Sequence, residues 1–319
     1  MRVRLIANPS ASSVSWELID QVRSRLEAVC EVELRLTERP RHAIELAGEP
    51  GADAVIGMGG DGTANEVANG VAPGSVVGVI PAGATSVFAR QLRLPSRPLP
   101  AAAVLAAAIA ERRWRPFGLG SVNGRKFTFS AGFGLDAEAT RIVAEKRQHR
   151  RDGRRPSDLA VVAAAALALR HDRFAMPERM TLDLAGASVR ASYLAIANQH
   201  PYTYFGRLPV RTAPRARFTS ALDAVAIGRL GPRQLWRLPV YGLVWPRHAG
   251  GHDAHVTYVH DVAALDLTCD EPVPLQLDGE YLGRVESAEV RYHPAAISVL
   301  IPPSVVASFP DPASAAAGT

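Results

Sequence analysis

An apolar run leads straight into a glycine-rich turn in the stretch Val55-Ile56-Gly57-Met58-Gly59-Gly60-Asp61-Gly62-Thr63-Ala64-Asn65-Glu66-Val67. The turn has four glycines in six positions, and a helix can begin directly after it with Thr63 as its cap. Glycines permit positive φ and let backbone N–H groups approach a ligand closely. A helix N-terminus adds unpaired donors and the positive end of a dipole. Strand, glycine turn and helix start together predict a phosphate-binding loop.

A single carboxylate, Asp61, lies inside this loop. A negative side chain is unfavourable beside phosphate unless it holds a cation or takes part in proton chemistry. The loop therefore predicts phosphoryl transfer with Mg²⁺, and Asp61 is the residue expected at the metal.

Two better-known phosphate motifs do not fit the chain. Gly57-x-Gly59-x-x-Gly62 has the spacing of the dinucleotide fingerprint, but that motif follows the first strand and needs an acid about 20 residues later. The glycines here follow the third predicted strand, and no Asp or Glu occurs from Val67 to Ala110. A Walker A loop needs Gly-Lys-Ser/Thr, whereas the two lysines of the chain are Lys126 and Lys146. An ordinary glycine-rich turn remains the structural alternative.

The order of the predicted elements indicates an α/β fold with two domains. Residues 1–115 alternate short apolar strands with amphipathic helices, which predicts a mostly parallel, doubly wound sheet with helices on both faces. Ligands of such sheets bind at the carboxyl ends of the strands, where Gly59–Gly62 and Gly83 fall. Residues 116–294 contain many short strand-like segments with helical insertions, and this pattern predicts an antiparallel β-rich domain. Residues 295–310 form a further segment with a last strand, and the tail from Asp311 is expected to be disordered.

The net charge of the chain indicates which classes of ligand it can bind. The chain has 319 residues, 47% hydrophobic content and a formal net charge of +5, with a pI near 9.5. This charge suits a nucleotide, a phospholipid surface or nucleic acid, but no pattern of stacking aromatic residues favours nucleic acid.

No run reaches the roughly 18 apolar residues of a membrane span, and the pattern of the N-terminal residues is that of a short strand. Two distant cysteines predict a reducing cytoplasm.

Six blocks together make the chain similar to the bacterial diacylglycerol kinase-like lipid kinases, which are related to the sphingosine kinases. A glycine block alone would be shared with NAD kinases and phosphofructokinases, but the Phe-Ala-Arg and Asp-Gly-Glu blocks narrow the resemblance to lipid kinases. The blocks run in the family's order at Ala7–Ser10, Gly59–Val67, Val79–Arg90, Ala131–Ala137, Pro201–Gly206 and Gln276–Glu280.

The resemblance implies a nucleotide-binding α/β domain, a β-sandwich domain and ATP as phosphoryl donor. It implies that a last strand returns to the first domain. Asp61 corresponds to the residue that organises Mg²⁺ and the phosphates, and Glu280 to the proton acceptor. Asp278 would fix the geometry of the loop that carries Glu280. The implied nucleotide contacts are Asn8, Ser10, Thr37, Gly59, Gly60, Asp61, Gly62, Thr63, Asn65 and Thr85.

The chain departs from the family at several positions. The first loop, Asn8–Ser12, lacks the usual glycine, and Gly83–Val87 replaces the pattern Gly-Thr-x-Asn-Asp. Gly118 stands where many members have Asp, and Ser220 stands where some members use an Asp in a structural Mg²⁺ site. These differences fit either a divergent enzyme or one with weakened catalysis.

Four further features have a plain structural interpretation beside a functional one. Asp278-Gly279-Glu280 on its own is a common hairpin turn. Four histidines between His248 and His260 match no tight zinc pattern, so a solvent loop leading into a strand is expected. The basic stretch Glu145–Asp158 is a linker or exposed loop, with contact to anionic lipid head groups as the alternative. The apolar helix expected at Leu159–Leu169 belongs to the core or lines an acyl-chain channel.

These features predict a cytoplasmic, peripherally membrane-associated kinase that uses ATP and Mg²⁺. The expected acceptor is a lipid hydroxyl, foremost that of diacylglycerol, and the expected product is phosphatidic acid. One alternative is an enzyme similar to NAD kinase with a soluble acceptor. Another is a lipid- or nucleotide-binding regulatory protein that has lost catalysis, and a homodimer is left open.

Overall fold

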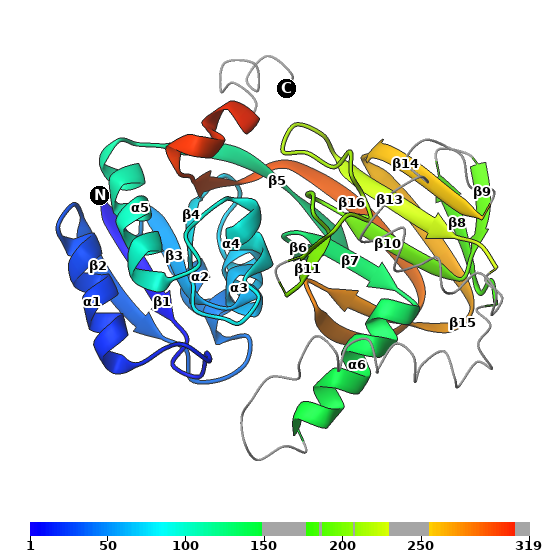
Figure 1. Ribbon diagram of the computed structural model, residues 1–319, viewed down its shortest axis with the longest axis horizontal. Coiled ribbons are helices and arrows are strands. Elements are labelled where there is room, and N and C mark those ends of the chain that lie inside the picture. The colour runs from blue at the N-terminus through cyan, green and yellow to red at the C-terminus, as the bar shows by residue number, and fades with distance from the viewer. Residues whose placement is uncertain (149–176, 185–186, 207, 230–254, 310–319) are drawn as a thin grey trace. The chain divides into compact units, whose positions relative to one another are not determined.

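The computed structural model describes residues 1–148, 177–184, 187–206, 208–229 and 255–309. The chain divides into two compact units (Figure 1). Unit 1 comprises Met1–Leu119 and His293–Thr319, and unit 2 comprises Gly120–Tyr292. The apolar helix expected at Leu159–Leu169 falls outside the described residues, and so does most of the basic stretch that begins at Glu145.

Unit 1 is built on a parallel sheet. Its strands pair in the order β2-β1-β3-β4, and the end of the last strand joins them through the parallel pair Ser298 and Val76. Leu5 lies between Leu34 and Ile56 in the register and is fully buried, as is Ile56. The strands are β1 (Arg2–Ala7), β2 (Glu31–Leu36), β3 (Ala54–Gly59), β4 (Val76–Pro81) and the C-terminal end of β16 (Glu280–Leu300).

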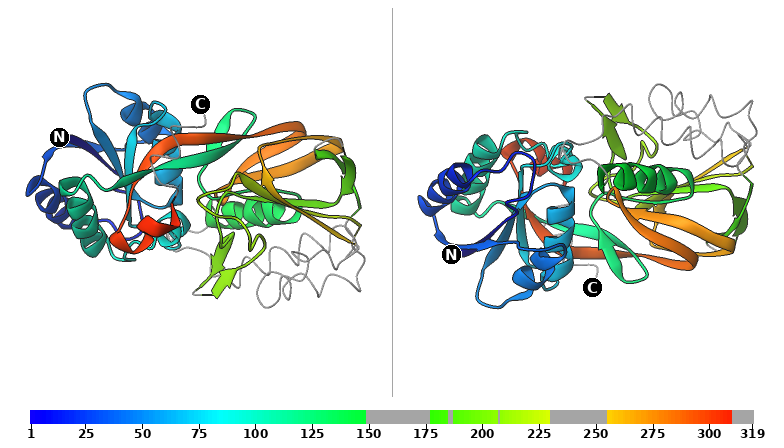
Figure 2. Two further views of the ribbon diagram at one scale, coloured as in Figure 1. Left: turned by 90° about the horizontal axis from the view of Figure 1, so that it is seen from above. Right: turned by 90° about the horizontal axis from the view of Figure 1, so that it is seen from below.

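Helices cover both faces of this sheet (Figure 2). The first crossover, through α1, runs from β1 to β2, whereas those through α2 and α3 run in the opposite direction along the sheet. Because parallel crossovers are right-handed, the change of direction puts α1 on one face and α2 and α3 on the other. α1 packs against α5, and α2 packs against α3. The helices are α1 (Trp16–Glu27), α2 (His42–Gly48), α3 (Asp61–Gly70), α4 (Val87–Gln91) and α5 (Pro98–Ala110), followed near the C-terminus by the 3-10 helix η2 (Pro303–Ser308).

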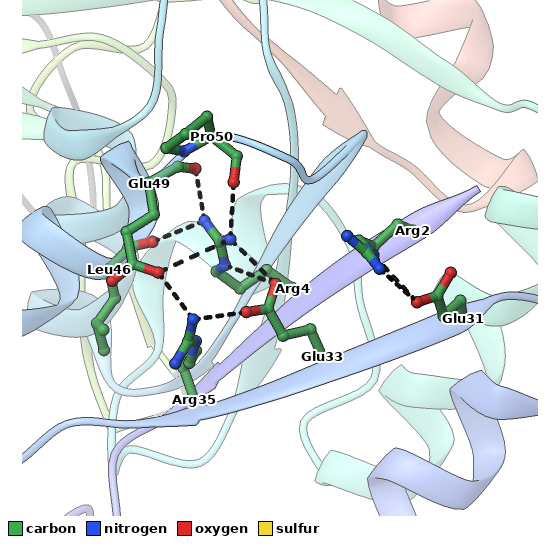
Figure 3. A network of polar contacts seen from close by, with 8 residues as sticks. All are labelled: Arg2, Arg4, Glu31, Glu33, Arg35, Leu46, Glu49 and Pro50. Atoms are coloured by element: carbon green, nitrogen blue, oxygen red, sulfur yellow. Dashed lines mark hydrogen bonds and ion pairs between the residues drawn. The ribbon is translucent and has the colours of Figure 1, made fainter.

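A buried arginine joins the sheet of unit 1 to the end of α2 (Figure 3). Arg4 on β1 is only 2% exposed, and its guanidinium donates to Glu33 on β2 at 3.0 Å. The same group donates to the carbonyl oxygens of Leu46 at 3.1 Å, Glu49 at 2.6 Å and Pro50 at 3.1 Å. A cation is favourable at the C-terminal end of a helix dipole. Arg4 therefore fixes α2 against β1, on the same face of the sheet as α3.

Unit 2 is a β-rich body with a large hydrophobic core and smaller buried clusters beside it. Its main run of antiparallel strands has the order β14-β13-β10-β7-β15-β16. Strand β15 pairs with β7 near its C-terminal end and with β8 near its start, so one long strand belongs to two branches around the core. Buried Phe127, Phe133, Leu182 and Leu194 belong to this core.

The parallel sheet of unit 1 with its helices and the β-rich unit 2 confirm the predicted α/β fold class.

The elements of unit 2 mostly follow the predicted pattern of short strands, but β15 is long. They are β6 (Arg125–Phe127), β7 (Ser130–Phe133), α6 (Leu135–Gln148), β8 (Met180–Leu184), β9 (Ala187–Ala191), β10 (Tyr193–Ala197), β11 (Thr203–Phe205), β12 (Leu208–Val210), β13 (Leu222–Ile227), β14 (Val256–Val262) and β15 (Ala264–Leu277), while β5 (Trp114–Val122) runs from unit 1 into unit 2. Where short strands were expected, β15 is one strand of 14 residues. A register shift between Thr268 and Val273 absorbs Pro272, so the proline does not end the strand.

Candidate active site

The glycine loop lies where β3 ends and α3 begins. Gly60 is the N-cap, with φ −90° and ψ −172°, and Asp61 is the first helical residue. The expectation of Thr63 as the cap is therefore wrong by one turn. Gly60 adopts the extended conformation of an N-cap, and an acid at the first helical position is favoured by the dipole. Gly60 has no side chain to cap the first-turn N–H groups, which leaves that end of α3 suited to an anion.

The glycines of the loop are not needed for positive φ, and Gly59 and Gly83 instead permit close packing. None of Gly57, Gly59, Gly60 and Gly62 has positive φ, which corrects that part of the expectation. A Cβ on Gly59 would lie 2.3 Å from Oγ1 of Thr63, so only glycine lets α3 start this close to β3. A Cβ on Gly83 would lie 2.5 Å from Cα of Gly60. At Gly62, which is exposed, a Cβ would meet no atom within 4 Å.

The loop after β1 contacts the start of α3. Asn8 donates its backbone N–H to the carbonyl oxygen of Met58 at 3.0 Å, and its Nδ2 donates to Oγ1 of Thr63 at 3.4 Å. Its Oδ1 accepts the N–H of Ser10 at 2.9 Å, which turns the chain toward solvent. Thr37 follows β2 and is half-buried, with its N–H on the carbonyl oxygen of Ala7. Asn8 and Thr63 are thus brought together, while Thr37 lies at the next strand end.

Asp61 is tied to the loop that follows β4. Its Oδ1 accepts the N–H of Phe88 at 3.1 Å, in the first turn of α4. Ser86 precedes that helix in the left-handed conformation, with φ 46°, and Thr85 beside it is half-buried. The carbonyl oxygen of Ala82 accepts the N–H of Ser13 at 3.2 Å. The ends of β1, β3 and β4 therefore meet around Asp61, as parallel strands predict.

Two residues of α3, Asn65 and Glu66, make side-chain contacts inside unit 1 that the sequence did not reveal. Asn65 is only 3% exposed, and its side-chain oxygen accepts Nδ2 of Asn69 at 3.1 Å, so it lies in the packed face of α3. Glu66 accepts the backbone N–H groups of Arg41 at 3.0 Å and Ala43 at 3.1 Å. It thereby caps α2, which has no side-chain cap of its own. The missing cap residue before His42 was the signal that could have pointed to it.

The second group of predicted residues belongs to unit 2, in the turn between β15 and β16. Leu277 pairs with Glu280, so Asp278 and Gly279 form a two-residue hairpin turn. Both have positive φ, 50° and 77°, as such a turn requires. The hairpin interpretation is therefore correct for the backbone.

The side chain of Asp278 is held far more firmly than a turn requires. It is 7% exposed. One carboxylate oxygen accepts the N–H and Oγ1 of Thr128 at 2.7 and 2.8 Å, and the other accepts the N–H groups of Phe129 and Ser130 at 2.9 and 3.0 Å. Four donors from the link between β6 and β7 thus fix the turn in place.

Glu280 begins β16 and is largely exposed. Its carboxylate accepts Nη2 of Arg125 on β6 at 2.6 Å, with 53% of its side chain exposed to solvent. An exposed ion pair of this kind contributes little to stability. It does set the direction in which the carboxylate points, and it leaves the group within reach of solvent and of an incoming molecule.

No cluster of three or more His, Cys, Asp and Glu suited to a metal occurs in the part of the chain that the structure describes. His260 instead pairs through Nδ1 with buried Asp223 at 2.7 Å. Ser220 makes a local turn with Arg217, donating its hydroxyl to that carbonyl oxygen at 3.2 Å. Within the described ranges, no helix is both long and apolar enough to cross a membrane.

Residues 2–122 match the diacylglycerol kinase catalytic domain family. The predicted resemblance to the bacterial diacylglycerol kinase-like lipid kinases is confirmed. A Bacillus subtilis diacylglycerol kinase is 38% identical over 154 residues, which cover 46% of this chain and 50% of that protein. A Pseudomonas aeruginosa protein named "Probable lipid kinase YegS-like" is 32% identical over 130 residues, 39% of this chain and 41% of that one. The chain thus spans about half the length of these relatives, or less.

Solved structures show that the fold likeness extends over almost the whole chain. A diacylglycerol kinase from Bacillus anthracis superimposes with a TM-score of 0.69 at 18% identity, covering 96% of this chain and 98% of the other. An NAD kinase from Archaeoglobus fulgidus in complex with ATP superimposes with a TM-score of 0.53 at 11% identity, covering 95% of each. At these identities the likeness establishes the fold alone.

Proposed function

We propose that the protein is an ATP-dependent lipid kinase that phosphorylates diacylglycerol to phosphatidic acid. The observation that carries the proposal is the loop of unit 1. Strand ends from β1, β3 and β4 meet around Asp61, and the uncapped first turn of α3 opens there. The same residues fall within the match to the diacylglycerol kinase catalytic domain family. The similarity of two relatives named as lipid kinases supports a lipid acceptor.

The residues of the loop fit Mg²⁺–ATP. Gly60 brings no capping side chain, and Gly62 borders open space, so phosphate oxygens can approach the first-turn N–H groups of α3. Asp61 offers a carboxylate oxygen, the kind of ligand that Mg²⁺ prefers. Bound there, Mg²⁺ would neutralise the charge that develops on the transferred phosphoryl group. The proposed nucleotide contacts remain Asn8, Ser10, Thr37, Gly59, Gly60, Asp61, Gly62, Thr63, Asn65 and Thr85.

The turn of unit 2 supplies the proton acceptor. An alcohol is a poor nucleophile until its proton has somewhere to go, and a carboxylate at the acceptor hydroxyl meets that need. Glu280 is exposed enough to reach an acceptor, whereas Asp278 is enclosed by four donors. Glu280 is therefore the general base in this proposal, and Asp278 is a positioning residue. The ion pair with Arg125 keeps the Glu280 carboxylate in one direction until the acceptor binds.

A membrane lipid has to be reached at a bilayer, so the proposal includes peripheral binding to an anionic membrane surface. The net charge of +5 supports it. Partitioning onto vesicles with and without anionic lipid, at low and high salt, measures this binding directly.

The test of the function is transfer of label from γ-labelled ATP with Mg²⁺. The full chain is given vesicles that contain diacylglycerol, extracted bacterial lipids or, in a parallel reaction, NAD. Label in phosphatidic acid is the expected result. Label on NAD alone would replace the proposal with the soluble-acceptor kinase that the shared fold allows. Nucleotide binding without transfer to any acceptor would favour the regulatory protein suggested by Val87, Gly118 and Ser220.

A further inference from the structure

A polar cluster inside unit 2 lies directly behind the Asp278–Gly279 turn. Asp136, near the start of α6, accepts the hydroxyl of Tyr202 at 2.7 Å and Nε2 of Gln276 at 3.1 Å, both on Oδ2. Nε2 of Gln276 also lies 3.1 Å from the hydroxyl oxygen of Tyr202. Gln276 and Tyr202 are 3% and 6% exposed. The phosphoryl-transfer roles proposed above use none of these three side chains.

The amide of Gln276 can adopt only one orientation in this cluster. A carboxylate accepts hydrogen bonds, so the NH₂ end of the amide faces Asp136. The Oε1 end then faces the turn, where it accepts the N–H of Gly279 at 2.8 Å. Gly279 is the residue before Glu280. One side chain therefore joins a buried pair to the backbone that carries the proposed base.

The chain around Asp136 is shaped to hold its carboxylate. A Cβ on Gly132 would lie 2.0 Å from Oδ2 of Asp136, so only glycine fits on β7 opposite it. Gly132 is also the residue that pairs with Gln276 across β7 and β15. The other oxygen of Asp136 accepts the N–H of Ala137 at 2.8 Å. Burial raises the pKa of Asp136, and the hydrogen bonds from Tyr202 and Gln276 oppose that rise.

We propose that Gln276 is a positioning residue of phosphoryl transfer, which sets the place of Glu280 by holding Gly279 to the Asp136–Tyr202 pair. This role rests on the proposed kinase function. Asp278 anchors one side of the turn to the link between β6 and β7, and Gln276 anchors the other side to α6. With both anchors in place, the first residue of β16 has little freedom to move. A shift of about 1 Å at a reacting group can cost on the order of 10²-fold in rate.

The test is a double-mutant cycle in the lipid kinase assay, with Gln276→Met and Glu280→Gln made singly and together. Met keeps the length of the side chain but removes both hydrogen-bonded ends. Gln276→Met is expected to lower kcat about 10- to 100-fold with unchanged ATP affinity. In the Glu280→Gln background the same substitution should cost little more, because residues that act through one group are not additive.

Two further variants separate positioning from general damage to unit 2. Asn123→Gly removes a side chain that accepts the N–H of Glu289 on β16 at 2.9 Å, and glycine suits its positive φ of 49°. It should leave kcat within about twofold, although it also loosens β16. Tyr202→Phe keeps the packing and removes one partner of Gln276, so it should give a smaller loss of kcat with the same non-additivity toward Glu280→Gln. It also preserves the test if Gln276→Met does not fold.

The outcomes distinguish this role from the function on which it rests. If wild-type protein transfers no label, the proposed function fails and the role of Gln276 falls with it. If the wild type transfers label and Glu280→Gln keeps wild-type turnover, the kinase function stands, but Glu280 is not the base and the role of Gln276 is overturned. If Glu280→Gln is slow but Gln276→Met and Tyr202→Phe turn over like wild type, only the role of Gln276 is overturned. The same holds if the losses from Gln276→Met and Glu280→Gln multiply as independent factors.

Discussion

In unit 1 the candidate site is made mainly of backbone, whereas in unit 2 the Asp278–Gly279 turn is held by side chains. The loop from Gly59 to Thr63 can adopt its conformation because Gly59 has no side chain, since a Cβ there would clash with Thr63. The turn gains its shape from a carboxylate with four donors and from an amide with partners at both ends. A backbone site suits a ligand that is the same in every reaction, such as a triphosphate. A side-chain site can position one reactive group.

The largest effect is expected at Glu280, the proposed general base in unit 2. Glu280→Gln should lower kcat and kcat/KM together by about 10²–10⁴-fold, because Gln keeps the size of the side chain but cannot accept a proton. Steady-state kinetics with diacylglycerol vesicles measures this loss. Arg125→Met is the matched control, since it removes the ion pair of Glu280 and leaves the carboxylate. A Glu280→Gln enzyme with near-native turnover would return the turn to a purely structural role.

The next effect concerns the charge in the glycine loop of unit 1. Asp61→Asn should lower turnover by about 10²–10³-fold, the usual loss for one preorganised electrostatic contact. Asn can still accept the N–H of Phe88 through its side-chain oxygen, so the loop and the start of α4 should persist. The test compares the activity of wild type and Asp61→Asn over a range of Mg²⁺ concentrations. Circular dichroism of both proteins checks that the variant is folded. Native kinetics in this variant would remove Asp61 from the mechanism.

A third effect tests how firmly side chains hold the turn of unit 2. Asp278→Ala leaves the donors of Thr128, Phe129 and Ser130 without their acceptor, and should lower the free energy of unfolding by about 3 kcal/mol. Urea denaturation compares it with Asp278→Asn, which keeps one acceptor oxygen and should lose less. Equal stability of wild type and Asp278→Ala would show that the turn does not depend on this carboxylate.

The smallest effect concerns the Arg4 network that fixes α2 in unit 1. Burial raises the pKa of Glu33, but the hydrogen bond and charge of Arg4, with the charge of Arg35, outweigh it and hold that pKa below the ordinary 4.5. A carboxyl with a lowered pKa in the folded state stabilises the fold above about pH 4.5 and loses this contribution as pH falls through the lowered value. Thermal melts of wild type and Glu33→Gln should therefore differ at pH 7 and converge in acid. A constant difference down to pH 3 would contradict this assignment.

The sequence predicted best where one local pattern decides the structure. Strand, glycine turn and helix start followed from Val55–Val67 because each depends on neighbouring residues alone. The start of α3 was placed too late because Gly60 serves as a cap through its backbone. The contact of Asp61 with Phe88 depends on how three strand ends converge, which spacing along the chain does not determine. The continuity of β15 past Pro272 depends on a register shift, which the local sequence does not show.

In unit 2, too, local features could be predicted from the sequence and contacts between distant segments could not. Asp-Gly is a recognisable hairpin signal, so the Asp278–Gly279 turn could be predicted from these two residues alone. The burial of Asp278 beneath residues 128–130 could not, because those partners lie about 150 positions earlier in the chain. Gln276 stood inside a motif block but gave no sign of its two-ended contact. That contact needs α6, β7 and β15 together.

ATP affinity is the most direct test of the central claim, that unit 1 binds the phosphates while the turn of unit 2 acts in chemistry. Titration calorimetry with Mg²⁺–ATP would compare wild type, Gly62→Val and Glu280→Gln. A Val side chain at residue 62 meets no protein atom at its Cβ, so the fold should tolerate it, but it would occupy the space over the first turn of α3. The prediction is that Gly62→Val loses ATP binding and Glu280→Gln keeps wild-type affinity. Unchanged affinity in Gly62→Val, or lost affinity in Glu280→Gln, would contradict it.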